Sequence, residues 1–298
     1  MGIGILCGFI AAFFNSVGYL LNARFLQRYK EEGRLLTYAL VSMMIITVPF
    51  LPFVFPFAAL EEPWWFLLKV VMWVAVFILG QGSFFMALRY FEASRLSSLL
   101  GLKIIVLALI FMLFHNGRLV PLQWVAIFVS AISAMMFNWS GAGRQNCLGW
   151  LFLGLTLLMY SSCDLLETSL ILHVKRSGLN DLHSSFAVIS AIYPALGLAA
   201  LPGMLKYRPS REQFALALPY AAVWVISQVV LLVCYARVLP VFGNVILATR
   251  GVFSVLLGAS LPLFGLASLD SKVSVRKWIQ RIVAALLMVL AIGLYSWR

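Results

Sequence analysis

Long apolar runs separated by short polar gaps fill the whole chain. A transmembrane helix needs about 20 mostly apolar residues. Charged residues, glycines and prolines gather in the gaps, as they do in the turns between helices. We therefore predict an all-α membrane protein with no soluble domain. Ten transmembrane helices are expected at residues 3–23, 35–57, 65–88, 93–114, 121–140, 147–172, 184–205, 214–236, 242–265 and 277–297.

The composition excludes a water-soluble globular protein. Of the 298 residues, 63% are hydrophobic and 11% are charged, and the mean hydropathy is +1.00, which leaves too little polar surface for a soluble fold of this size. The net charge of +12 comes from Lys and Arg residues spread over the gaps between apolar runs. This distribution suits lipid headgroups better than nucleic acid, so we expect the lipid bilayer as a partner and no nucleic acid.

Polar residues recur at matched positions in two apolar stretches, which indicates an internal duplication. Gln81 is followed 147 positions later by Gln228, and Lys103 is followed by Arg250 at the same interval. Binding sites of transporters lie at the interface between such repeats. The first helices of the two copies correspond more loosely, through Asn15-Ser16 and Ser161-Ser162.

The predicted helices divide into two five-helix repeats, residues 1–143 and 144–298, within one integral membrane unit. An odd number of crossings per repeat makes the second repeat enter the membrane from the opposite side, so the repeats should be inverted. Lys and Arg are more frequent in the connections that follow odd-numbered helices. The positive-inside rule then predicts that both termini lie outside. We expect a multi-pass protein of the bacterial inner (plasma) membrane.

Part of the first repeat carries short motifs of a known family. The motifs are Ala87-Leu88-Arg89-Tyr90, Ala93, Leu96, Leu99 and Leu100, then Gly117-Arg118-Leu119 and Gln123-Trp124 after an apolar helix. This pattern resembles the repeat of the drug/metabolite transporter superfamily, specifically its EamA-type ten-helix members. The resemblance implies a central cavity that is lined by the first, third and fourth helices of each repeat.

Two features depart from that family pattern. Lys103 and Arg250 occupy or adjoin the place where the family commonly has a proline early in the fourth helix of each repeat. The loop that starts at His115 reads His-Asn-Gly-Arg, whereas the family often has a glutamate before this arginine. The first departure puts a cation where the family usually has none, so transporters of neutral compounds are poor guides to the substrate.

Lys103 and Arg250 are the first candidates for substrate binding. An isolated cation within the membrane costs on the order of 3 kcal/mol, so both side chains should face the protein interior or a wet cavity. There they can bind an anionic group of the substrate, Arg through two parallel hydrogen bonds and Lys as a point charge. In phosphate-translocating members of the superfamily, basic residues on the corresponding helices do this. The alternative is internal neutralisation by Asp164 and Glu167.

Asp164 and Glu167 are candidates for proton coupling. Their spacing of three residues places both on one face of the helix predicted at 147–172. A carboxyl group in a partly desolvated cavity can alternate between protonated and ionised forms, which proton-coupled transport requires. The alternative for Glu167 is an ordinary interfacial charge near the end of the helix.

Uncharged polar residues in the predicted cavity-lining helices complete the candidate binding site. They are Gln81, Gln228, Asn15, Tyr19 and Ser162. Interhelical hydrogen bonds, which are worth about 0.6 kcal/mol each, are the competing explanation for every one of them. The four cysteines show no metal-ligand spacing, and no Ser-centred or Glu-x-x-His arrangement occurs. We therefore expect no metal, no cofactor and no enzymatic activity.

These patterns together predict a secondary transporter that moves a small polar metabolite by alternating access. The rough balance of cations and acids in the cavity favours an amino-acid-like zwitterion or an organic anion as the small-molecule substrate, with protons as a candidate coupling ion. Flipping of a lipid-linked or phospholipid headgroup is the alternative within transport. A non-transporting membrane receptor is the alternative from another functional class.

Overall fold

A computed structural model describes residues 1–29, 32–57, 59–91, 96, 99–115, 119–136, 147–207, 210–260 and 275–297. Within these ranges every regular element is a helix. In chain order the elements are α1 (Gly2–Tyr29), α2 (Glu32–Thr47), η1 (Val48–Phe50), α3 (Leu51–Val54), α4 (Pro63–Ala87), η2 (Leu100–Leu102), α6 (Lys103–His115), α7 (Pro121–Met136), α8 (Cys147–Lys175), α9 (Asp181–Lys206), α10 (Arg211–Val238), α11 (Pro240–Leu247), α12 (Arg250–Ser260) and α13 (Val275–Ser296).

Seven helical stretches among the described residues are long and apolar enough to cross a membrane. They are α1, α2 with its continuation through η1 and α3, α4, α8, α9, α10 and α13. Two shorter apolar helices, α6 and α7, cover parts of the segments predicted at 93–114 and 121–140. The predicted all-α membrane fold is confirmed, and the chain is an integral, multi-pass membrane protein.

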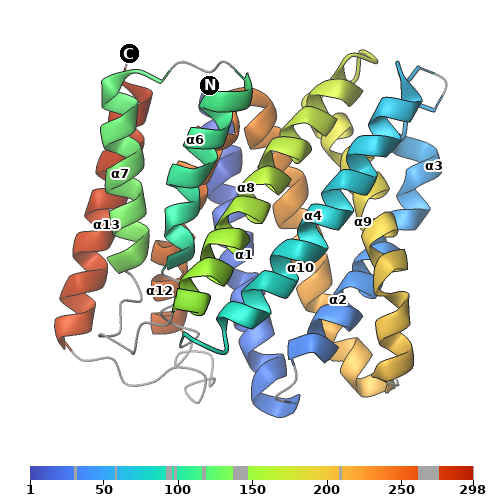
Figure 1. Ribbon diagram of the computed structural model, residues 1–298, viewed down its shortest axis with the longest axis horizontal. Coiled ribbons are helices and arrows are strands. Elements are labelled where there is room, and N and C mark those ends of the chain that lie inside the picture. Colours follow the sequence, from blue (N-terminus) through green and yellow to red (C-terminus); the bar gives the residue numbers. More distant parts are fainter. Residues whose placement is uncertain are drawn as a thin grey trace.

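The helices stand side by side in one bundle, with α7 and α13 paired at one edge and α2 and α9 at the other (Figure 1). In the middle, α1 packs along α10 and α4 packs along α8. The five segments of one half can be matched in order with the five segments of the other. α1 then corresponds to α8 and α4 to α10, so the pair α1–α10 is equivalent to the pair α8–α4. Each edge pair joins two matching segments. A two-fold relation between inverted repeats produces this pairing. The predicted boundary at residues 143 and 144 lies outside the described residues.

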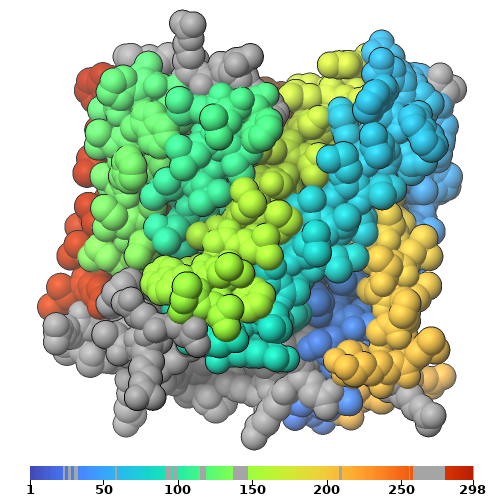
Figure 2. Space-filling model, viewed as in Figure 1, coloured from blue at the N-terminus to red at the C-terminus, as the bar shows by residue number. Residues whose placement is uncertain are grey.

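Large apolar side chains cover the outer surface of the bundle. Leu113 on α6, Leu205 on α9 and Leu286 on α13 are each more than half exposed. Figure 2 shows one such face, on which α7, α6, α8, α4 and α9 lie next to one another. Water would make this apolar exposure costly, whereas lipid tails solvate it readily. The surface thus agrees with the membrane location that the sequence predicts.

Two helices are interrupted at equivalent places. The single 3₁₀ turn η2 precedes α6, which begins at Lys103. In the second half a turn at 248–249 separates α11 from α12, which begins at Arg250. The sequence predicted continuous helices over 93–114 and 242–265, and the structure corrects both. Broken helices leave backbone groups free to bind other partners, so each cation lies where a binding site can form.

Close contact between α2 and α9 depends on Gly197. A β-carbon at this position would lie 2.4 Å from Cβ of Met44 and 3.1 Å from the carbonyl oxygen of Leu40. Neither atom can give way without moving α2, so we expect Gly197→Ala to lower the free energy of unfolding by about 1–3 kcal/mol. Thermal unfolding of the purified protein in detergent measures this loss. Gly154→Ala on α8 is the control, because no atom lies within 4 Å of its added β-carbon. Equal losses in the two variants would contradict the prediction.

Candidate functional site

Both interrupted helices receive a serine hydroxyl at the break. Ser16 Oγ of α1 donates to the carbonyl oxygen of Arg250 at 2.8 Å, and Ser161 Oγ of α8 donates to the carbonyl oxygen of Lys103 at 3.3 Å. The two serines are 145 positions apart, so this interval aligns α1 with α8. The looser sequence alignment pairs Ser16 with Ser162, whereas the structure pairs Ser16 with Ser161, one residue earlier. Small polar side chains thus stabilise the helix breaks from equivalent positions.

Lys103 is neutralised inside the bundle. Its Nζ lies 2.7 Å from Oδ2 of Asp164 on α8, a residue that is only 7% exposed. The same oxygen accepts a hydrogen bond from Asn244 Nδ2 of α11 at 2.7 Å. The Asn244 amide also donates to Tyr235 Oη and to the carbonyl oxygen of Pro240, at 2.8 and 2.9 Å. A buried carboxylate needs such partners, and here a cation and an amide stabilise its ionised form.

Arg250 has a different neighbour. Its guanidinium carbon lies 5.6 Å from the centroid of the Tyr19 ring, which is a cation–π contact. Among the described residues it forms no ion pair. Tyr19 is 42% exposed. It also lies near enough to Tyr160 on α8 and Tyr220 on α10 to interact with them electrostatically. The ring is thus partly exposed, and the cation beside it has no acidic partner among the described residues.

The two halves place different groups beside their cations. Asp164 and Tyr19 are 145 positions apart, the same interval as the two serines at the helix breaks. One repeat position thus carries a carboxylate in α8 and an uncharged ring in α1. This difference explains why Lys103 is paired with an acid and Arg250, among the described residues, is not. The alternative of internal neutralisation applies to the first cation and, within the described part of the chain, not to the second.

Glu167 lies one helical turn after Asp164 on α8 and is 6% exposed. Its Oε1 accepts a hydrogen bond from Trp73 Nε1 of α4 at 3.1 Å. The indole of Trp73 stacks on Phe77 and meets Tyr193 of α9 edge-on, so the direction of its N–H is fixed. This burial between α4, α8 and α9 argues against an ordinary interfacial charge.

The first half of the sequence is similar to a known protein family. The model of the EamA-like transporter family matches residues 2–139, which contain α1 to α7. The predicted resemblance to EamA-type transporters is confirmed. The match indicates a membrane transporter of the drug/metabolite kind.

A solved structure titled "Crystal structure of protein" has the same fold as this EamA-like chain. The TM-score is 0.69 at 14% sequence identity, and the match covers 98% of this chain and 96% of that chain. At this identity the likeness establishes the fold alone, and it extends over both halves of the bundle. No curated protein matches the chain.

The other predicted site residues lie on α1, α4, α8 and α10. Asn15 of α1 is 2% exposed, and its Oδ1 has no hydrogen-bond partner among the described residues. Gln228 of α10 is buried, and Gln81 of α4 is half-buried. Ser162 of α8 donates to the carbonyl oxygen of Leu158 in its own helix at 2.9 Å. All four stay candidates for substrate contact.

Sequence reasoning left out two side chains that complete the site, Tyr235 and Trp73. Nothing in the pattern of the sequence distinguished Trp73 from the other tryptophans of the chain.

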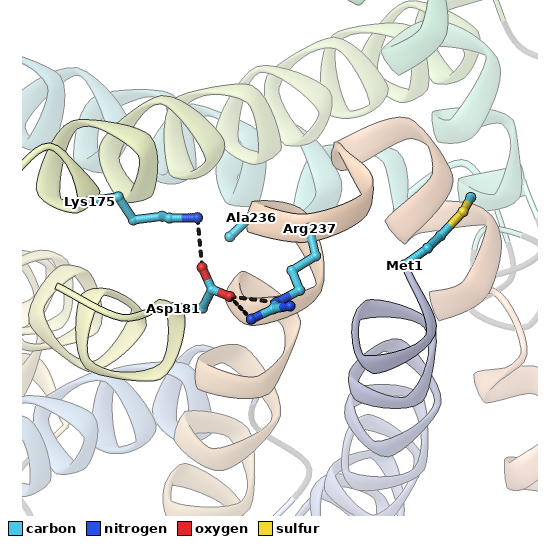
Figure 3. A pocket seen from close by; sticks show the side chains of 5 residues that line it. All are labelled: Met1, Lys175, Asp181, Ala236 and Arg237. Carbon is cyan, nitrogen blue, oxygen red and sulfur yellow. Dashed lines mark hydrogen bonds and ion pairs between the residues drawn. The ribbon is translucent and has the colours of Figure 1, made fainter. Parts of the chain in front are cut away.

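A separate group of charges lies at the end of the bundle that carries both termini (Figure 1). Lys175 Nζ of α8 lies 2.6 Å from Oδ1 of Asp181, and Arg237 of α10 binds Oδ2 of the same carboxylate at 2.5 Å. Figure 3 shows the two cations reaching Asp181 from opposite sides, beside a pocket of about 410 Å³ that Met1 and Ala236 also line. These ion pairs connect the ends of α8, α9 and α10, away from Lys103 and Arg250.

Proposed function

We propose that this EamA-like protein is a secondary transporter for a small polar metabolite with an anionic group, either an organic anion or an amino-acid-like zwitterion. The observation that carries the proposal is the position of Arg250. It is a cation inside the membrane region, without an acidic partner among the described residues and beside the partly exposed ring of Tyr19. A carboxylate or phosphate group matches the planar guanidinium through two parallel hydrogen bonds.

The internal symmetry supports alternating access as the mechanism. Each half contributes one broken helix with a cation at the break, and the central pairs α1–α10 and α4–α8 are equivalent. Two inverted repeats can exchange their packing arrangements at small energetic cost, and such an exchange opens a site between them to the other side of the membrane. Substrate bound at Arg250 would therefore face each side in turn.

The first test is ligand-dependent thermal stabilisation of the purified protein. The panel contains pyruvate, L-alanine, succinate, inorganic phosphate and choline. Binding to the folded state alone raises stability by mass action, by about 2.7 kcal/mol when the ligand concentration is 100 times its Kd. We expect one or more anionic or zwitterionic compounds to raise the midpoint of unfolding and choline to have no effect. Stabilisation by choline alone, or by no compound, would overturn the proposal.

A second measurement distinguishes a transporter from a receptor and from a headgroup flippase. The protein is reconstituted in phosphatidylethanolamine–phosphatidylglycerol vesicles, and uptake of the stabilising compound is followed with a radioactive label. Saturable uptake supports the proposal. Binding without uptake would indicate a receptor, and movement of labelled phospholipid in place of the solute would indicate a flippase.

A further inference from the structure

The two buried acids of α8 differ in the groups that stabilise their charge. Asp164 has both a cation and an amide as partners, Lys103 and Asn244. Glu167 has one uncharged donor, Trp73, and forms no ion pair among the described residues. An ionised carboxylate with so little compensation is costly to bury. Glu167 is therefore the acid of the two whose charge depends least on its described partners, and its Oε2 is left to take up a proton while Oε1 accepts the Trp73 bond.

The groups around Glu167 do not supply a second cation within the described part of the chain. Among the described residues, the base that acts on Glu167 is Lys103, which Asp164 already engages at 2.7 Å. The other titratable neighbours are uncharged in their ordinary states or carry the same sign as an ionised Glu167. They are Asp164 and Cys163 on α8, Tyr193 on α9 and Tyr235 on α10.

The charge balance of the whole site then depends on two groups. Because Lys103 and Asp164 cancel, the net charge is set by Arg250 and Glu167. The site is neutral when it is empty and Glu167 is ionised, since Arg250 balances that acid. It is neutral again when an anion occupies Arg250 and Glu167 is protonated. Every other combination carries a net charge, which is expensive to enclose within the membrane.

From this balance we propose that Glu167 is the proton-binding site of the transporter and that one proton accompanies each monovalent anion in the same direction. This inference rests on the proposed function, and it narrows the substrate class to compounds that bring a net charge of minus one to the site. A proton from water on one side binds Oε2 of Glu167 while the anion binds Arg250. Both leave on the other side, and the empty site returns with Glu167 ionised.

The first experiment locates the proton without any ligand. Infrared spectra of the purified protein are recorded over a pH series, and the carbonyl band of a buried carboxylic acid is followed. We expect the wild type to gain this band toward the acidic end of the series, where the empty site takes up a proton, and Glu167→Gln to lack it. The control is the double variant Lys103→Met with Asp164→Asn, which removes the neighbouring ion pair and should keep the band. Loss of the band in the control with retention in Glu167→Gln would overturn the assignment, as would absence of the band in the wild type.

A second variant tests the assignment without altering the acid itself. Trp73→Phe keeps an aromatic ring in the core but removes the one donor to this carboxylate that the described residues supply. Loss of a bond that favours the ionised form should make the acid band persist to a higher pH, by about one unit. A band that titrates as in the wild type would contradict the role given to Glu167.

The last experiment tests coupling in vesicles that contain a pH-sensitive dye. The probe is pyruvate, or L-lactate if pyruvate does not stabilise the protein. In the wild type, uptake should acidify the vesicle interior by one proton per anion, and an inward proton gradient should drive accumulation. In Glu167→Gln both effects should be lost while anion binding remains. Wild-type uptake of the anion without protons would overturn the coupling and leave the proposed function intact. Absence of all anion binding would instead defeat the proposed function, and the infrared result would still decide the proton site.

Discussion

Replacing Lys103 with methionine should lower the free energy of unfolding by about 3–5 kcal/mol, because it leaves the buried carboxylate of Asp164 without its counter-charge. The two groups are 2.7 Å apart, and both are largely buried. Asn244 alone would then stabilise the charge, and an amide does not replace a cation. Unfolding by denaturant in detergent measures the loss.

The matched control removes both members of the pair. In the double variant Lys103→Met with Asp164→Asn, no uncompensated charge remains, so its stability should lie much closer to that of the wild type than to that of Lys103→Met. A double-mutant cycle gives the interaction energy directly. If the two single effects were simply additive, the ion pair would contribute nothing, and the central assignment of Lys103 as a structural cation would be wrong.

Arg250→Gln should behave in the opposite way. We expect the affinity for the stabilising anion to fall about 10- to 100-fold, which corresponds to the 1.5–3 kcal/mol typical of hydrogen bonds to a charged group. Stability without ligand should fall less than in Lys103→Met, since no described acid is in ion-pair contact with Arg250 and its contact with Tyr19 is partly exposed. Thermal stabilisation by increasing concentrations of the anion, compared between variant and wild type, measures the effect.

Arg250→Lys refines this prediction. Lysine keeps the positive charge but lacks the planar pair of donors that a carboxylate or phosphate group fits, so its affinity should be intermediate. Equal affinity in Arg250→Lys and the wild type would mean that charge alone recognises the ligand. Unchanged affinity in Arg250→Gln would show that Arg250 does not contact the anion, and the proposed binding site would have to be abandoned.

The sequence by itself determined the fold class and the presence of a repeat. Apolar runs of membrane length leave a chain only one kind of structure in lipid, because every backbone group must be hydrogen-bonded within its own segment. The recurrence of Gln81 at Gln228 and of Lys103 at Arg250 revealed the duplication without any structure. The cost of a charge in the membrane marked both cations and both acids as residues that need a partner or a ligand.

Only the tertiary structure decided which partner each charge has. Glu167 meets Trp73 across α4 and α8, and Asn244 reaches Asp164 from α11. These contacts depend on how helices distant in sequence are placed and rotated, and hydrophobic periodicity carries no such information. The same holds for the difference between Lys103, paired with a carboxylate, and its counterpart beside Tyr19. The cost of burying a charge depends on the residue and its own membrane segment, so the sequence identified the charged residues of the site. Their partners depend on the packing of helices that are distant in sequence, so only the structure assigned their roles.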